Sequence, residues 1–335
     1  MSLRLSIKKY LAQIGVNKEM TNMLTEIKNR RTLKGEAKCF AKNWELTAMA
    51  VPAVILLIIF NYIPLFGLVL PFKDYRFDLG FFKSPWVGLE NFRFLFSGKD
   101  VLVATRNTIL YNAAFIISGL VIAVIFAIMM YELGRRSVKT YQTIFFLPYF
   151  VSWVVASYAF SGFLDVEFGI FNKIFNRLGM ESIAWYSEPK YWPFIILFVN
   201  TWKGMGYNII IFYTELMSID KTLYEAASVD SATRIQQIRY ITLPCLKRIV
   251  VLLLIMNIGK MFMGDFGLFY NVPLNSSLLY STTDVLDTYV YRALINLGKV
   301  GMSSAATFYQ SIVGFVLVML SNHIVKKLDE DNAVF

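Results

Sequence analysis

The sequence predicts an all-α polytopic membrane protein with six transmembrane helices. Hydrophobic residues make up 56% of the 335 residues and charged residues 17%, and the mean hydropathy is +0.52. A water-soluble fold of this composition would expose too much apolar surface, which excludes the ordinary soluble classes. Six stretches are each apolar over roughly the 20 residues that a helix needs to cross a bilayer. They are residues 46–70, 107–131, 141–163, 193–216, 248–268 and 304–325.

The spans divide the chain into three parts. Residues 1–45 are a basic N-terminal segment without the short apolar core and small-residue cleavage site of a removable signal peptide. Residues 46–327 form the six-helix transmembrane domain, and residues 328–335 form a short C-terminal tail. Because the number of crossings is even, we expect both termini on the same side of the membrane.

The distribution of Lys and Arg predicts which side this is. With the N-terminus inside, the cytoplasmic segments hold twenty Lys and Arg residues and the opposite loops hold eleven. Short loops rich in these residues stay cytoplasmic, so both termini and the insert at 218–247 are predicted to be cytoplasmic in a cell-membrane protein. Six basic residues in the first outer loop, 71–106, dilute the bias. The net charge of +10 follows mostly from this asymmetry beside anionic lipid headgroups and requires no nucleic-acid partner.

Few residues could support chemistry by this chain itself. Both cysteines, Cys39 and Cys245, fall on the predicted cytoplasmic side, where disulfides are rare. His323 is the single histidine, whereas a metal site needs several clustered ligands. The sequence has no Gly-x-x-x-x-Gly-Lys-Ser/Thr pattern of a nucleotide-binding loop. We therefore expect no catalytic residue, no metal and no bound cofactor in this chain.

Residues 218–247 form a long polar insert between the fourth and fifth spans. Ser218 or Asp220 can cap a first helix at the start of this insert. Residues at the i, i+3, i+4 spacing form one face of that helix, and two of them have small side chains that would let a partner approach closely. This face consists of Leu223, Ala226 and Ala227.

The second half of the insert leads into the fifth span. A break near Ser231 precedes a second helix, and Pro244 starts the span at a first-turn position where its missing N–H costs nothing. Periodicity alone fits a partner-binding helix and an amphipathic connector resting on lipid headgroups equally well.

Residue identity within the insert is more informative than its periodicity. The chain has Glu225-Ala226-Ala227, three residues, Ser231, nine residues, Ile241, one residue, and Leu243-Pro244. This spacing resembles the EAA loop of binding-protein-dependent ABC importer permeases, which has Gly at the place of Ser231. Serine adopts a left-handed backbone less readily than glycine, so we expect a less tight break and a first helix that can run on past it.

Two further regions extend the resemblance over most of residues 46–327. Near the start they include Asn61-Tyr62-Ile63-Pro64, Phe72-Lys73-Asp74-Tyr75 and residues 84–92, and near the end Asp287-Thr288-Tyr289-Val290 and residues 305–314. These segments resemble the first span, the first and last outer loops and the sixth span of the carbohydrate branch of the same permeases, the LplB-like and maltose-permease-like subunits.

The resemblance implies the fold and assembly of a type I ABC importer. In such a transporter two six-helix permease subunits form the path, and two cytoplasmic ATPase subunits bind ATP and Mg. An extracytoplasmic solute-binding protein delivers the oligosaccharide. The insert would be the cytoplasmic coupling helix, through which the ATPase moves the spans. Glu225 would face a basic group of the ATPase, Ala226 and Ala227 would allow close contact, and Asp230-Ser231 would shape the turn.

Polar groups deep within the spans are the candidates for the translocation path, because leaving them unpaired in hydrocarbon is costly. The alternative for each is a hydrogen bond between helices, which for Asn257 and Gln310 is at least as well founded. The candidates are Tyr149, Ser152 and Trp153 in the third span, Asn200, Trp202, Lys203 and Asn208 in the fourth, Asn257 and Lys260 in the fifth, and Gln310 in the sixth.

Lys203 and Lys260 carry additional information because a cation within a span needs an anionic partner. One interpretation pairs them with Glu215 and Asp265 near the span ends. The other assigns the partner role to a substrate that carries carboxylates, such as a uronate oligosaccharide.

Two other classes of protein remain open at this point. A polytopic enzyme acting on lipid-linked sugars would place clustered acidic or histidine residues at the membrane interface. The spans and the loops between them have no Asp-x-Asp or His cluster, and Asp284 with Asp287 fits a solvated pair in the last outer loop. A secondary transporter subunit would leave the polar insert without a role.

Overall fold

The described part of the chain is helical apart from its connections. The computed structural model describes residues 44–96 and 98–328, and within them the one β-type pairing is an isolated bridge between Lys73 and Trp86. Nearly all of the predicted basic N-terminal segment and most of the predicted C-terminal tail lie outside the described residues. The chain divides into two compact units, Met1–Leu68 and Val69–Phe335, which we describe separately.

The described part of the first unit is an apolar helical segment. It begins with α4 (Trp44–Leu57), continues through a π-helical turn (Ile58–Tyr62) and passes into a 3-10 helix (Ile63–Phe72) that reaches the second unit. In a regular α-helix the ring of Pro64 would clash with the carbonyl of Phe60, and the wider π turn before it relieves this clash. Large apolar side chains are exposed along the segment, as a lipid-facing helix requires.

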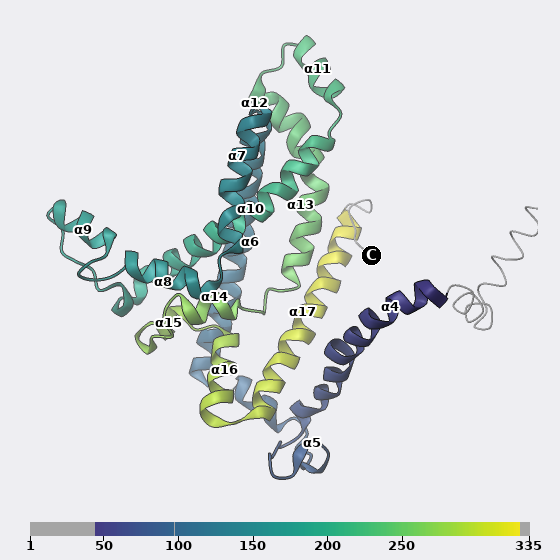
Figure 1. Ribbon diagram of the computed structural model, residues 1–335, viewed down its shortest axis with the longest axis vertical. Coiled ribbons are helices and arrows are strands. Elements are labelled where there is room, and N and C mark those ends of the chain that lie inside the picture. The colour runs from purple at the N-terminus through teal and green to yellow at the C-terminus, as the bar shows by residue number, and fades with distance from the viewer. Residues whose placement is uncertain (1–43, 97, 329–335) are drawn as a thin grey trace, which may run out of the picture. The chain divides into compact units, whose positions relative to one another are not determined.

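Four long helices form the core of the second unit (Figure 1). They are α6 (Lys99–Tyr131), α10 (Trp192–Ser218), α13 (Leu243–Ile258) and α17 (Val300–Leu328). Among the described elements, α6 and α10 make the most extensive helix–helix contact. Ala123 and Ala127 of α6 are fully buried and cluster with Phe212 and Leu216 of α10. Small side chains at this seam let the two backbones approach closely.

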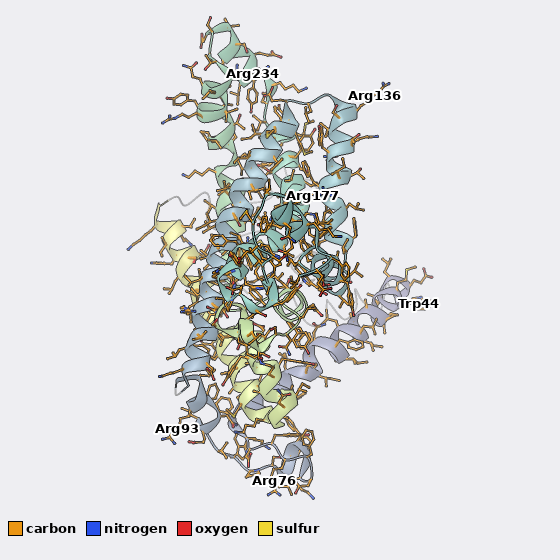
Figure 2. The ribbon with its side chains drawn as sticks, turned by 90° about the vertical axis from the view of Figure 1, so that its left-hand side faces the viewer. Trp44, Arg76, Arg93, Arg136, Arg177 and Arg234 are labelled. Atoms are coloured by element: carbon orange, nitrogen blue, oxygen red, sulfur yellow. The ribbon has the colours of Figure 1, made fainter. Side chains whose placement is uncertain are left out.

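The helices of the second unit define two ends (Figure 1). α6 and α17 run from the end that carries α16 (Leu286–Leu297) toward the end that carries α11 (Lys221–Val229), and α13 runs in the opposite direction. We call these the α16 end and the α11 end. Figure 2 places Arg136 and Arg234 near the α11 end, and Arg76 and Arg93 at the α16 end. The two inner loops predicted between spans therefore share one end, as a six-span topology requires.

Within the described residues, five helical segments are long and apolar enough to cross a membrane, and a bent helix pair gives a sixth crossing if it counts as one span. The five helical segments are Trp44–Phe72, Lys99–Tyr131, Pro189–Ser218, Arg234–Ile258 and Val300–Lys327. The sixth is Arg136–Phe150 together with Trp153–Phe163, which are bent by 99° at their junction. The second and last spans begin several residues earlier than predicted.

The prediction that the third span, 141–163, is a single helix is wrong. α7 (Arg135–Phe146) ends in a 3-10 turn (Leu147–Phe150), and α8 (Trp153–Phe163) starts in a new direction. Pro148 lies in that turn, and the Ser152 side chain caps α8 by accepting a hydrogen bond from the Val155 N–H at 3.2 Å. A new N-cap after a proline turn ends one helix and begins another.

The prediction of a fifth span at 248–268 is also wrong in its bounds. The helix starts at Arg234 and stops at Ile258, and the next helix, α14 (Phe266–Asn271), begins only after Asp265. The Asp265 carboxylate caps α14 by accepting a hydrogen bond from the Leu268 N–H at 3.2 Å. Residues 259–265 are therefore a non-helical connection directly after the span, and we call them the break segment.

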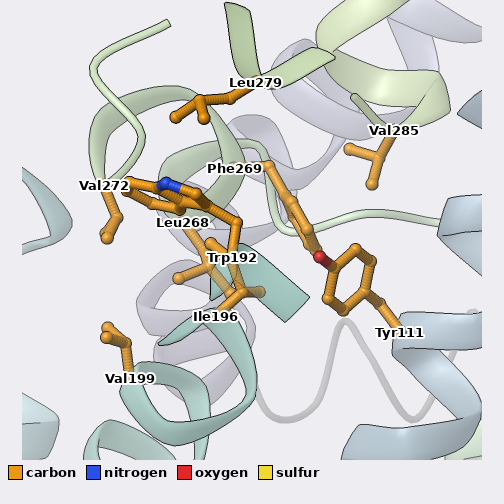
Figure 3. Packing of buried hydrophobic residues seen from close by; sticks show 9 residues of the cluster. All are labelled: Tyr111, Trp192, Ile196, Val199, Leu268, Phe269, Val272, Leu279 and Val285. Carbon is orange, nitrogen blue, oxygen red and sulfur yellow. The ribbon is translucent and has the colours of Figure 1, made fainter. Parts of the chain in front are cut away.

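A second hydrophobic core lies toward the α16 end, where short helices pack on α6 and α10 (Figure 3). Trp192 is fully buried there, and its Nε1 donates a hydrogen bond to the Trp185 carbonyl at 2.7 Å. The rings of Tyr111 and Phe269 pack edge to face, 4.9 Å apart. The remaining short helices are α5 (Gly80–Lys83), α9 (Ile170–Arg177), α15 (Tyr280–Thr283) and 3-10 turns at Glu90–Phe96, Trp185–Ser187, Pro189–Tyr191 and Ser277–Leu279.

Candidate functional site

The first helix of the polar insert is α11, and its start is capped by Asp220. The Asp220 carboxylate accepts a hydrogen bond from the Thr222 N–H at 3.0 Å, and this bond lowers the pKa of Asp220. Ser218, the other predicted cap, instead donates to the Glu215 carbonyl at the end of α10. A negative charge at a helix N-terminus is favourable because free N–H groups point toward it.

The end of α11 corrects the expectation for Ser231. The helix stops at Val229, and Ser231 adopts a left-handed backbone with φ of 59°. The Ser231 N–H donates to the Ser228 carbonyl at 3.1 Å, and the Ala232 N–H donates to the Ala227 carbonyl at 2.9 Å. These two bonds form the Schellman motif that usually has glycine at this position. The helix therefore does not run on, and serine keeps the tight turn of the family pattern.

Substitutions at Ser231 test whether this turn matters for the transport that the sequence resemblance implies. Because a left-handed residue with a Cβ costs roughly 1–2 kcal/mol, Ser231→Gly should keep or raise the uptake rate. Ser231→Val adds a β-branch to the same strained backbone and should lower the uptake rate about tenfold. Ala232→Val is the matched control, since Ala232 has an ordinary negative φ. Uptake by Ser231→Val equal to that of the unchanged protein would contradict this role of the turn.

The second helix of the insert has a start signal that our reading of the sequence missed. α12 (Arg234–Gln237) begins with a capping box in which the Thr233 side chain accepts from the Gln236 N–H and the Gln236 side chain accepts from the Thr233 N–H. The Thr-x-x-Gln pattern is the available sequence signal. A π turn (Ile238–Thr242) follows, and it accommodates Pro244 in the second position of α13.

Two polar contacts join the two halves of the insert and leave one surface of it free. The Tyr224 hydroxyl lies 3.0 Å from the Thr242 hydroxyl, and the buried Gln237 amide donates to Ser228 Oγ at 3.2 Å. The predicted contact residues lie outside this network: Glu225, Ala226, Asp230, Leu243 and Pro244 are exposed, and Ala227 is half-buried. Three large apolar side chains accompany them, with exposures of 47% for Leu223, 85% for Val229 and 78% for Ile235.

A groove of about 1030 Å³ lies beside this surface at the α11 end. Its charged lining comes from the end of α6, from α7, and from α11 and α12 of the insert: Glu132, Lys139, Lys221, Glu225 and Arg234. Arg234 and Glu132 form an ion pair of 3.6 Å that joins the insert to the end of α6. Both side chains are substantially exposed, so this pair contributes little stability by itself. The exposed insert and groove together can accommodate a protein partner.

A separate polar cavity of about 370 Å³ lies within the bundle, between α6, α10 and the end of α13. Four of the ten predicted path residues line it: Asn200, Asn208, Asn257 and Lys260. Asn200 and Asn208 are two turns apart on one face of α10 and form no hydrogen bond within the described chain. The Asn257 amide nitrogen donates to its own helix at the Leu253 carbonyl, 2.8 Å away.

Lys260 is the cation of this cavity, and it forms no ion pair with any described residue. Asp265 also lines the cavity, but its carboxylate accepts the Trp153 Nε1–H at 2.8 Å and caps α14. The predicted pairing of Lys260 with a nearby carboxylate is therefore not formed. An ammonium beside free amide groups can bind hydroxyl and carboxylate oxygens of a ligand.

Lys203 lies elsewhere and has a different environment. Its Nζ donates to the Tyr149 carbonyl at 2.8 Å and lies over the rings of Tyr149 and Trp153 at 5.5 and 5.1 Å. Tyr149 is itself stacked on Tyr207, with ring centroids 5.5 Å apart. The predicted pairing of Lys203 with Glu215 or Asp265 is thus not formed, and the lysine joins the bent third span to α10.

The remaining path candidates take structural positions. Ser152 caps α8, and the Trp202 ring packs edge to face on Phe160 at 5.5 Å. Gln310 is buried, with 4% of its surface exposed, and its Nε2 donates to the Phe262 carbonyl at 2.6 Å and to Asp287 Oδ2 at 3.1 Å. None of these residues, nor Tyr149, Trp153 or Lys203, is among the residues that line the cavity.

The prediction that Asp284 and Asp287 are a solvated pair is wrong. Asp284 is buried and forms an ion pair with Arg292, and it also accepts the Thr288 hydroxyl at 2.6 Å. Burial raises the pKa of Asp287, whose Oδ2 accepts the Gly264 N–H at 2.5 Å. No sequence pattern indicates these contacts of Asp287, because its partners Gly264 and Gln310 are each 23 residues away.

Comparisons with known proteins agree with this arrangement. Residues 119–330 match the family described as binding-protein-dependent transport system inner membrane component. The chain is 32% identical to Protein LplB of Bacillus subtilis, over 85% of this chain and 90% of that protein. It is also 32% identical to the polygalacturonan/rhamnogalacturonan transport system permease protein YteP of Bacillus subtilis, over 85% of this chain and 89% of that one.

The fold matches a chain in crystal structures of a bacterial ABC transporter involved in the import of the acidic polysaccharide alginate. The TM-score is 0.79 at 30% identity, with 87% of this chain and 98% of that chain covered. A second structure of a bacterial alginate ABC transporter, in complex with an alginate pentasaccharide-bound periplasmic protein, gives a TM-score of 0.78 at 29% identity, with 87% and 97% covered.

Proposed function

The chain belongs to the family of binding-protein-dependent transport system inner membrane components, and we propose that it is the permease subunit of an ATP-driven importer of an acidic oligosaccharide. In this proposal it forms half of the translocation path and a second six-helix permease forms the other half. The observation that carries the proposal is the exposed insert at the α11 end, which keeps the family's spacing and its tight turn.

The proposed energy source is a separate ATPase that binds at this insert. Two ATPase subunits would hold ATP and Mg, and this chain would bind no cofactor of its own. Support comes from the surface of α11, where Glu225 and Ala226 are exposed and Ala227 is half-buried. Small side chains allow a partner to approach the helix, and apolar neighbours such as Val229 supply area to bury. Both chain termini and the α11 end would then face the cytoplasm.

The proposed substrate class rests on the cavity within the bundle. Asn200, Asn208 and Lys260 present amide groups and one ammonium without partners in the described chain. Amides hydrogen-bond sugar hydroxyls, and an ammonium favours a carboxylate. The acidic polysaccharide named for the structural relative is consistent with this chemistry. An extracytoplasmic solute-binding protein would deliver the saccharide to the α16 end, as the complex of the second alginate structure supports.

The other functional classes have less support. A polytopic enzyme would need a reactive cluster, and the acidic residues of the last outer loop are engaged in Asp284–Arg292 and Asp287–Gly264 contacts. A secondary transporter subunit would give the exposed insert no role.

Co-purification tests the assembly directly. An affinity-tagged chain extracted in mild detergent should bring down an ATPase subunit and a second permease in stable amounts. Their absence from a complex that retains transport activity would contradict the proposal.

A further inference from the structure

The break segment, residues 259–265, is held by side chains from three different helices. Asn112 of α6 donates from Nδ2 to the carbonyls of Met261 and Met263, at 3.1 and 3.0 Å. Gln310 of α17 donates to the Phe262 carbonyl at 2.6 Å. Asp287 of α16 accepts the Gly264 N–H at 2.5 Å. Each of these four backbone groups, which have no partner within a helix, thus forms a hydrogen bond with a side chain.

Backbone groups need such hydrogen-bond partners where a transmembrane helix stops inside the protein. Non-helical backbone at this depth is tolerated only when it is buried in protein or lines a cavity, because free N–H and C=O groups are costly in hydrocarbon. The break segment meets the second of these conditions. Met263, Gly264 and Asp265 line the polar cavity together with Lys260.

Two glycine contacts show how closely the break segment fits its neighbours. A Cβ at Gly264 would lie 2.9 Å from Asp287 Oδ2 and 2.8 Å from Val285 Cγ2. At the other end, a Cβ on Gly314 of α17 would lie 2.5 Å from the Gly259 carbonyl oxygen. The segment therefore has little freedom to shift unless α16 or α17 shifts with it.

We infer that Asp287 and Gln310 are positioning residues that fix the break segment, and thereby hold the Lys260 ammonium toward the substrate in the cavity. This inference rests on the proposed function. Neither side chain lines the cavity, so each acts through the backbone that it binds. The two side chains also bind each other, Gln310 Nε2 to Asp287 Oδ2 at 3.1 Å, which makes them a single unit. Affinity for an acidic oligosaccharide is then set partly by residues that never touch it.

The test is the uptake kinetics of Gln310→Leu and Gly264→Ala in the assembled transporter, with an acidic oligosaccharide as substrate. Gln310→Leu removes the donors to Phe262 and Asp287, and Gly264→Ala pushes the backbone away from Asp287. Each should raise KM about tenfold, the effect of one lost buried hydrogen bond, while the maximal rate changes less than about threefold. Ser311→Ala is the matched control in α17, because its hydroxyl bonds only within that helix, to the Thr307 carbonyl. Gly162→Ala is the control for glycine, since nothing lies within 4 Å of its added Cβ.

A second measurement separates positioning from loss of folding. The amount of assembled complex is measured for every variant, and uptake is expressed per complex. An unchanged KM in both variants overturns the inference, and so does a fall in maximal rate with KM unchanged. The KM of Lys260→Met is measured in the same assay. If it is raised while the KM values of Gln310→Leu and Gly264→Ala stay normal, only the positioning role is overturned. An unchanged KM for Lys260→Met overturns the proposed substrate contact itself.

Discussion

Glu225→Lys is expected to lower ATP-driven uptake at least about 100-fold while leaving the protein in the membrane. Glu225 is exposed on α11 and forms no ion pair within the described chain, so reversing its charge should not disturb the fold. In the proposed assembly it faces a basic group of the ATPase. A like-charge contact at an interface costs several kcal/mol, which corresponds to this loss of uptake. Uptake of labelled saccharide by cells, divided by the amount of membrane-inserted protein, is the measurement.

The matched control is Glu181→Lys, which reverses an exposed glutamate in the loop after α9, away from the insert. It should transport normally. Normal uptake by Glu225→Lys with a normally assembled ATPase would remove the basis for assigning the insert to energy coupling.

Lys260→Met is expected to raise KM for an acidic oligosaccharide about 10- to 100-fold and to leave KM for a neutral oligosaccharide of the same length nearly unchanged. The reason is that a hydrogen bond to a charged group contributes about 1.5–3 kcal/mol, and only the acidic substrate offers the carboxylate. Methionine keeps the length of the side chain and removes the charge. Competition between the two saccharides in one uptake assay measures the selectivity.

Lys203→Met is the informative comparison. Lys203 binds the Tyr149 carbonyl and two aromatic rings outside the cavity, so its loss should affect both substrates equally. If Lys260→Met lowered the uptake of both substrates equally, Lys260 would have a structural role as well. No residue of the cavity would then explain a preference for an acidic substrate.

Hydropathy located the spans but not their directions. The third stretch is apolar throughout, yet Pro148 and Ser152 split it into two helices, and an average over a window cannot register a change of axis. The fifth stretch reads as apolar up to residue 268, although the helix stops at Ile258. The hydrogen bonds that satisfy the break come from Gln310 and Asn112, which are 48 and 149 residues away in sequence. Contacts at that separation are not visible in a single sequence.

The candidate residues for the translocation path fall into two groups for a similar reason: some line the cavity, and others bind within the protein. Asn200 and Asn208 could be placed on one face from their spacing alone, and the structure brings that face to the cavity. Gln310 has the same polarity and depth, but its side chain is engaged by Phe262 and Asp287. Depth identifies a polar side chain that needs a partner, and only packing reveals whether the protein already supplies that partner.

Ser231 shows how local preference and context compete. The left-handed backbone is unfavourable for serine by roughly 1–2 kcal/mol, which is why a run-on helix was expected. The two bonds that close the turn and the capping box at Thr233 outweigh this preference. The spacing of the motif was therefore a better guide to the turn than the identity of one residue.

The most direct test of the account is uptake by the purified complex in proteoliposomes. In the proposed assembly the complex contains this chain, a second permease and the ATPase. The solute-binding protein and an acidic oligosaccharide are added on the side of the α16 end. The account predicts uptake that requires ATP on the ATPase side and the binding protein on the other, and that stops when either is omitted. Uptake that continues without ATP, or ATP-driven uptake by a complex that lacks this chain, would contradict it.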